Sequence, residues 1–175
     1  MTRVLSRESL ITAIRKNPQQ YNCVIIIEPF NREHGLVVGG LSRTTLDRMR
    51  KYPKDKVIVQ FWDIEDEAEW LEGPQEHHVR TVLDWAKDKE VDIVACHAGI
   101  SRSSALAILI ECQKVFAGRP VSVREAIQSL GLYHDFHRPN RLILKHGAKI
   151  LNRPEIPLEV AYWKKGGNFI PKIGA

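Results

Sequence analysis

Three short apolar runs constrain the fold of this chain more than any other feature of its sequence. They lie at residues 23–27 (CVIII), 57–62 (VIVQFW) and 91–95 (VDIVA). Runs of this length that are rich in β-branched residues are typical of strands buried on both faces of a sheet. Because stretches with helical periodicity separate them, the sequence predicts an α/β fold, with a central, mostly parallel sheet and helices on both faces.

Helices are predicted where apolar residues recur at helical spacing behind a polar cap. A short helix begins near Ser6 and buries Leu10, Ile11 and Ile14. Further helices are predicted at residues 42–51, 74–89, 103–115, 122–130 and 141–151. Beyond residue 151 the pattern is interrupted by Pro154, Pro157, Gly166, Gly167 and Pro171. The sequence therefore predicts one domain over residues 1–151 and a tail over residues 152–175 that packs on the domain or is partly mobile.

Composition narrows the class of protein. With 175 residues, of which 43% are apolar, the chain is long enough to bury a core. No apolar run approaches the roughly 18 residues that a membrane span needs, and the N-terminus lacks the apolar stretch of a signal peptide. Three cysteines do not make a disulfide framework, which indicates a reducing, cytoplasmic location. The net charge of +5 favours anionic ligands, but the basic residues are scattered, so nucleic acid is not an expected partner.

The third apolar run leads directly into the segment that carries chemistry. Cys96 is followed by five loop residues and then by Arg102; the five are His97, Ala98, Gly99, Ile100 and Ser101. At a strand–loop–helix junction, backbone N–H groups converge into an anion-binding nest beside the positive end of a helix. A thiol at the base of such a nest loses its proton easily. Arg102 offers a planar fork for two phosphate oxygens, and the hydroxyl of Ser103 can donate to a departing thiolate.

This segment predicts hydrolysis of phosphate monoesters without a metal or another cofactor. The Cys96 thiolate would attack phosphorus and form a thiophosphate intermediate. A nearby carboxylic acid would protonate the leaving oxygen and then activate water. Candidates follow the second apolar run, where parallel strands place them at the same sheet edge as Cys96. They are Asp63, Glu65, Asp66 and Glu67.

A Cys-x5-Arg segment followed by Ser resembles the protein tyrosine phosphatase superfamily, in particular its small dual-specificity branch. The resemblance extends upstream to Phe61-Trp62-Asp63 and downstream to Arg138-Pro139-Asn140, and so covers residues 22–151. It implies that Cys96 is the nucleophile, that Arg102 binds phosphate, that Ser103 assists and that Asp63 is the general acid. It also implies a phosphorylated protein or peptide as substrate, phosphotyrosine above all, and a loop that holds a phosphate or sulfate ion.

Two points depart from the family pattern or stay open. Ala95 stands where the family usually has a histidine that shapes the loop and tunes the thiolate, and His97 follows the cysteine instead. Both Asp63 and Asp66 have spacings that fit the general acid. Asp63 is preferred because it follows the strand directly, and Asp66 is the alternative.

Three other functions compete with that of a protein phosphatase. An RNA 5′-phosphatase fits the pI of 9.2. A phosphoinositide phosphatase of the same superfamily often carries a lysine inside the loop, which this chain lacks. A phosphate-binding module without catalysis does not need the thiol. A metal site is not expected at His77, His78, His134 or His137, because no cysteine or paired carboxylate completes one. Cys23 and Cys112 are expected in the core.

Overall fold

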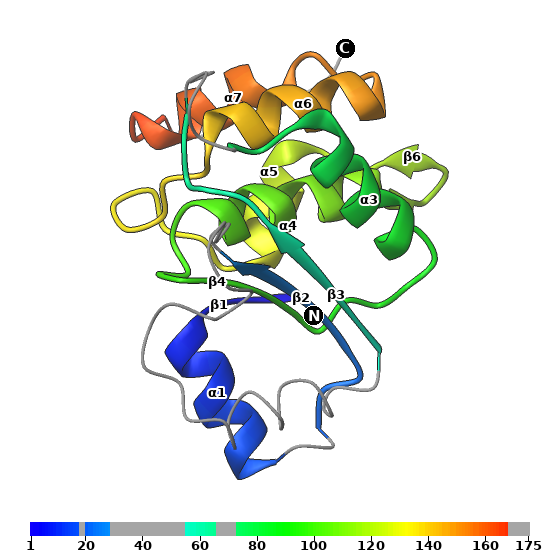
Figure 1. The fold of residues 1–175 in the computed structure, drawn as a ribbon. Helices are drawn as coiled ribbons and strands as arrows, with labels where there is room; N and C mark the ends of the chain where they lie inside the picture. Colours follow the sequence, from blue (N-terminus) through cyan, green and yellow to red (C-terminus); the bar gives the residue numbers. More distant parts are fainter. Residues whose placement is uncertain (18–19, 29–54, 66–72, 168–175) are drawn as a thin grey trace.

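The computed structural model describes residues 1–17, 20–28, 55–65 and 73–167. Its centre is a sheet of four parallel strands in the order β1-β4-β2-β3. The strands are β1 (Arg3–Ser6), β2 (Cys23–Glu28), β3 (Asp55–Gln60) and β4 (Ile93–Cys96). Figure 1 shows α1 (Arg7–Lys16) on one face of this sheet and the other helices on the opposite face. The predicted parallel α/β architecture is confirmed.

The helices of the second face are α3, α4, α5, α6 and α7. Their bounds are Glu76–Ala86, Arg102–Gln113, Val123–Ser129, Arg141–Leu151 and Ile156–Lys164. The helix predicted at residues 42–51 lies outside the described residues. The one predicted at residues 103–115 ends two residues early, because β5 (Val115–Phe116) and β6 (Arg119–Pro120) form a hairpin there. The turn of this hairpin places Ala117 and Gly118 at positive φ.

Alternation along the strands divides the core into two clusters. Ile93 and Ala95 of β4 pack with Val24 and Ile26 of β2 against the apolar side of α1. Val94 and Cys96 belong to the larger cluster, on the face covered by α3 to α7. The side-chain period of two in a strand therefore decides that Cys96 is directed away from α1.

Helix α4 occupies the centre of the larger cluster. All its residues from 102 to 112 are buried, because the sheet lies on one side and α3, α5 and α6 lie on the others. The contact with α6 is close: a Cβ added at Gly147 would overlap the side chain of Leu109. A helix enclosed in this way has little freedom to shift, so the loop that precedes it starts from a fixed point.

Within the predicted tail of residues 152–175, residues 156–164 form a helix, α7, which the interrupted sequence pattern did not predict. Pro157 lies in the first turn of this helix, where its missing N–H costs no hydrogen bond. Ile156, Val160 and Trp163 are buried in the larger cluster. Pro157 thus lies at the start of a helix, although a proline in the sequence indicates that a helical pattern is interrupted. Among the described residues, no helix is long and apolar enough to cross a membrane.

Candidate active site

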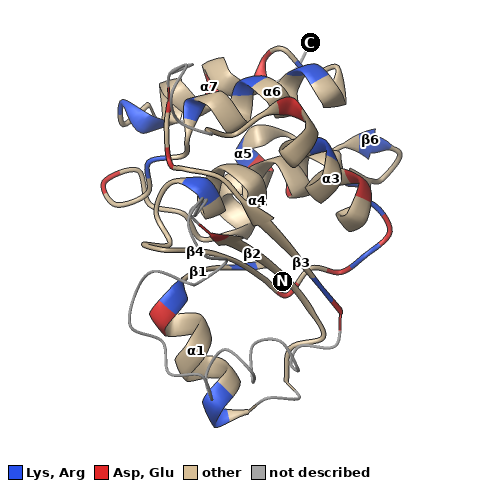
Figure 2. Cartoon of the chain, viewed as in Figure 1, with Lys and Arg blue, Asp and Glu red and all other residues tan. Residues whose placement is uncertain are grey.

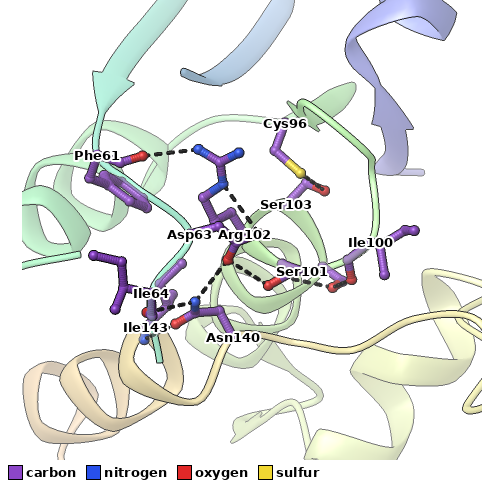
Figure 3. A network of polar contacts seen from close by, with 11 residues as sticks. Phe61, Asp63, Ile64, Cys96, Ile100, Ser101, Arg102, Ser103, Asn140 and Ile143 are labelled. Atoms are coloured by element: carbon purple, nitrogen blue, oxygen red, sulfur yellow. Dashed lines mark hydrogen bonds and ion pairs between the residues drawn. The ribbon is translucent and has the colours of Figure 1, made fainter. Parts of the chain in front are cut away.

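The thiol of Cys96 lies at the junction between the sheet and α4. Cys96 is the last residue of β4 and only 2% exposed. Its Sγ is 3.1 Å from the Oγ of Ser103, which is fully buried in the first turn of α4 (Figure 3). A hydroxyl at this distance can donate to a thiolate. The structure therefore brings the predicted nucleophile and its predicted helper together.

The loop of residues 97–101 is tied to its surroundings through its carbonyl groups. The carbonyl of His97 accepts from the N–H of Arg7 at 3.3 Å, and that of Ile100 accepts from the N–H of Arg138 at 3.1 Å. The carbonyl of Ser101 accepts from the N–H of Asn140 at 3.3 Å. No N–H of residues 97–101 donates to a described residue. Donors left without partners in a fixed loop are what an anion-binding nest requires.

Gly99 lets this loop lie against the end of β1. Its φ is +72°, a conformation that side chains disfavour. A Cβ at this position would lie 2.5 Å from the N of Ser6 and 2.7 Å from the carbonyl carbon of Leu5. Both are backbone atoms of β1, which cannot move aside without breaking the sheet. The loop shape therefore depends on glycine for two independent reasons.

Arg102 closes the loop, and two of its three guanidinium nitrogens differ in their hydrogen bonding. Its side chain is buried, and Nη1 donates to the carbonyl of Phe61 at 2.9 Å. Among the described residues, Nε is buried without a hydrogen-bond partner and forms an ion pair with Asp63, at 3.6 Å from Oδ2. Buried donors are normally bonded, so an unbonded one at the mouth of an anion nest fits an oxygen of a bound anion.

Asp63 reaches the loop from the chain segment after β3. Its Oδ1 accepts from the Oγ of Ser101 at 2.7 Å and from the Nδ2 of Asn140 at 2.9 Å (Figure 3). Phe61 is fully buried and Trp62 is 41% exposed, so the alternation of β3 continues past its end and anchors the segment. The structure thus brings Cys96, Arg102, Ser103 and Asp63 into one site. Asp66 and Glu67 lie outside the described residues, and Glu65 pairs with Arg141.

Two residues of this site escaped the sequence-based prediction. Asn140 is fully buried and joins α6 to the segment after β3. Its Oδ1 caps α6 by accepting from the N–H of Ile143, and its Nδ2 donates to Asp63 and to the carbonyl of Ile64. The sequence signal for it was an asparagine in front of a helix, which indicates a cap but not a second task. Arg7 was the other, and its side chain contacts the ring of His97.

The other cysteines, and the histidines considered as metal ligands, do not belong to this site. Burial raises the pKa of Cys23 to about 11 and that of Cys112 to about 12, as expected for core thiols. His78 stacks on Phe61 with ring centroids 5.2 Å apart, and burial lowers its pKa to about 4. Within the described part of the chain, no three His, Cys, Asp or Glu side chains are grouped as metal ligands would be.

Comparison with known proteins identifies the fold. No family model and no curated protein matches the sequence. The crystal structure of PTPMT1 in complex with PI(5)P is 13% identical over 89% of this chain and 90% of its own length, with a TM-score of 0.52. The chain has a protein tyrosine phosphatase fold. The structure of Tk-PTP in the active form is 12% identical over 93% of this chain and 88% of its own, with a TM-score of 0.37.

The protein tyrosine phosphatase fold was the one that the Cys-x5-Arg resemblance implied. In this fold the segment from Cys96 to Arg102 is the turn between the sheet and its most buried helix. At such low identity the likeness concerns the fold, so the chemistry of the site must be argued from its own atoms.

Proposed function

We propose that this chain is a cysteine-dependent phosphatase that hydrolyses phosphate monoesters, with phosphotyrosine in proteins as its preferred substrate. One observation carries the proposal: a buried thiol lies at a loop whose N–H groups donate to no described residue, and a guanidinium nitrogen at the end of this loop has no hydrogen-bond partner there either. A non-catalytic phosphate-binding module would use the same loop but would have no need of the thiol. The protein tyrosine phosphatase fold supports the catalytic alternative.

In the first step, the N–H groups of residues 97–101 and the Nε of Arg102 bind the phosphate oxygens. The Cys96 thiolate attacks phosphorus, so an S–P bond forms while the P–O bond to the leaving group breaks. The leaving oxygen takes a proton from Asp63. Because Oδ1 of Asp63 already accepts two hydrogen bonds, Oδ2 is the oxygen left to carry this proton.

In the second step, a water molecule hydrolyses the thiophosphate. Asp63, now a carboxylate, accepts a proton from the water as its oxygen bonds to phosphorus. The S–P bond breaks, the electron pair returns to sulfur, and inorganic phosphate leaves. The hydroxyl of Ser103, at 3.1 Å from Sγ, donates to the thiolate as it forms. Every residue in the cycle thus ends in the state in which it began.

A phosphoinositide phosphatase is the second candidate. The loop has no lysine, but the buried guanidinium of Arg7 lies 3.0 Å from His97 and brings a positive charge to its first turn. PTPMT1, which shares the fold, binds PI(5)P. Lys and Arg residues are distributed over α1, α6, α7 and the β5–β6 hairpin (Figure 2), so an RNA 5′-phosphatase has weaker support.

The experiment compares hydrolysis of p-nitrophenyl phosphate, with a chelator present, by the wild type, Cys96→Ser and the matched core variant Cys23→Ala. We expect Cys96→Ser to lose roughly 10³-fold or more in kcat, as a lost nucleophile does, and Cys23→Ala to keep its rate. Full turnover by Cys96→Ser, or loss of wild-type turnover with the chelator, would sink the proposal. A phosphotyrosyl peptide, PI(5)P micelles and a 5′-triphosphate RNA then rank the substrate classes by kcat/KM.

A further inference from the structure

Arg7 is a buried cation that none of the steps above uses. It is the first residue of α1, directly after β1, and its side chain is only 8% exposed. Arginine is seldom buried to this extent unless a carboxylate pairs with it. Among the described residues, no carboxylate forms an ion pair with Arg7, and its Nη1 is buried without a hydrogen-bond partner. Burying an unpaired charge costs desolvation free energy, so a function for Arg7 is expected.

The contacts of Arg7 all lead to the first residue of the loop. Its Nη2 is 3.0 Å from the Nδ1 of His97, and its backbone N–H donates to the His97 carbonyl at 3.3 Å. Because a guanidinium can only donate, Nδ1 must accept, and the proton of the neutral imidazole resides on Nε2. One residue therefore fixes both the backbone and the ring of the position next to Cys96.

Because of where Arg7 lies in the fold, its contacts with His97 support the whole loop. Ser6, the residue before it, lies beside Cys96 in the register of β1 and β4. Gly99 packs on the backbone of Leu5 and Ser6. The junction between β1 and α1 is therefore the platform on which the first half of the loop rests. Ala95, on the other side of Cys96, is buried in the apolar cluster of α1 and offers the loop no polar group.

We propose that Arg7 is a positioning residue for the phosphate-binding loop, which it holds through His97, and that its buried charge favours a loop occupied by an anion. The inference rests on the proposed function, since it concerns the same site. An anion in the loop supplies a counter-charge that no described residue offers Arg7, so removing the guanidinium weakens the binding of the anion. Arg7 itself does not contact the reacting atoms.

The test measures anion binding without any turnover. Inorganic phosphate bound in the loop should protect Cys96 from alkylation by iodoacetamide. The alkylation rate is followed by intact mass, and the phosphate concentration that halves this rate gives an apparent Kd. For Arg7→Gln we expect this Kd to rise about tenfold or more, as for a lost charge-assisted contact. Arg7→Lys, which keeps the charge without the fork, should recover part of the loss.

The matched control is Arg3→Gln, which removes the same charge from the far end of β1. Arg3 is exposed and bonds only to the hydroxyl of Tyr21 among the described side chains. Its Kd for phosphate should stay within about twofold of the wild type. A wild-type Kd in a folded Arg7→Gln variant would overturn the inference, as would an equal loss in Arg3→Gln.

If Arg7→Gln does not fold, His97→Ala tests the same contact from its exposed side. We expect a rise in Kd of about threefold or more, the range for a single hydrogen bond. Where both variants fold, the double variant should bind phosphate more tightly than independent losses would predict, because the two side chains act together. A wild-type Kd in His97→Ala, or additive losses, would overturn the role of the contact. Failure of wild-type turnover, with phosphate protection intact, would instead reject the proposed function alone.

Discussion

The carboxylate of Asp63 is held at the loop by groups from separate parts of the chain. Ser101 comes from the loop itself, Asn140 from the residue that caps α6, and Arg102 from the start of α4. Such convergence fixes the distance between the acid and the nucleophile before a substrate arrives, and positioning of this kind is a large part of catalysis. The role of Asp63 as the general acid is therefore the first prediction to check.

We expect Asp63→Asn to lose about 10²–10⁴-fold in kcat on a phosphotyrosyl peptide, the usual range for general acid–base catalysis. The loss should be much smaller on an aryl phosphate whose phenol is strongly acidic, because that group leaves without a proton. Steady-state kinetics on both substrates check this. Asp66→Asn should show a smaller change that is equal for the two substrates, and the reverse pattern would transfer the role to Asp66.

A second residue-scale prediction concerns His78 of α3. Its Nδ1 accepts from the N–H of Gln75, and burial, with smaller effects of His77 and His146, lowers its pKa from 6.5 to about 4. The unfolded chain therefore binds more protons than the folded one between these pH values. The stability that the neutral ring contributes is complete above pH 6.5 and is lost as the pH falls toward 4.

Urea unfolding at pH 7 and pH 4.5 measures this contribution. The loss of unfolding free energy between the two pH values should be roughly 1–3 kcal/mol smaller for His78→Gln than for the wild type. Glutamine keeps an acceptor for the N–H of Gln75. His134→Gln, at an exposed histidine, should retain the wild-type dependence on pH. An unchanged pH dependence in His78→Gln would show that another group is responsible.

At the scale of elements, the loop depends on its contact with β1. Gly99→Ala would press a Cβ against the backbone of Ser6 at a positive φ, so we expect a loss of unfolding free energy of at least about 1–3 kcal/mol and of phosphate binding as well. Gly118→Ala is the matched control, since its φ is +77° but a Cβ would meet no atom within 4 Å. It should cost only about 1 kcal/mol and leave the Kd for phosphate unchanged. If Gly99→Ala and Gly118→Ala had equal effects, the positive φ would explain the loss and the contact with β1 would not.

The helices and strands that were predicted are those whose sequence pattern lies within the segment itself. The three apolar runs became β2, β3 and β4, and the helix at residues 141–151 has the predicted bounds, because periodicity and caps decide such segments. Strand β1 was missed because four residues with one exposed and three half-buried side chains carry no pattern, and its pairing with β4 is a tertiary event. In the site, Asn140 and Asp63 are 77 positions apart, so their hydrogen bond could not be read from spacing.

At the scale of the whole molecule, the three cysteines share the larger buried cluster but fall into two chemical classes. Cys23 and Cys112 have thiols whose pKa is raised to about 11 and about 12, chiefly by burial, so they stay protonated near pH 7. Of the three cysteines, Cys96 alone lies at the loop for which anion binding is proposed. Iodoacetamide at pH 7 should therefore add one group to the folded protein, at Cys96, and three in urea. Mass spectrometry of the digested protein checks the site, and an early adduct at Cys23 or Cys112 would contradict it.

The order of the strands also bears on how the molecule moves. Strand β4, which carries Cys96, lies between β1 and β2, whereas β3, which leads to Asp63, pairs with β2 alone among the described strands. Amide hydrogens of an inner strand exchange with solvent mainly when the whole fold opens, while those near an outer strand exchange through local openings. We therefore expect slower hydrogen exchange in β4, which carries the nucleophile, than in β3, which leads to the acid. The sulfur therefore belongs to the part of the sheet that opens last, and Asp63 is kept at the loop by Ser101 and Asn140 rather than by its own strand.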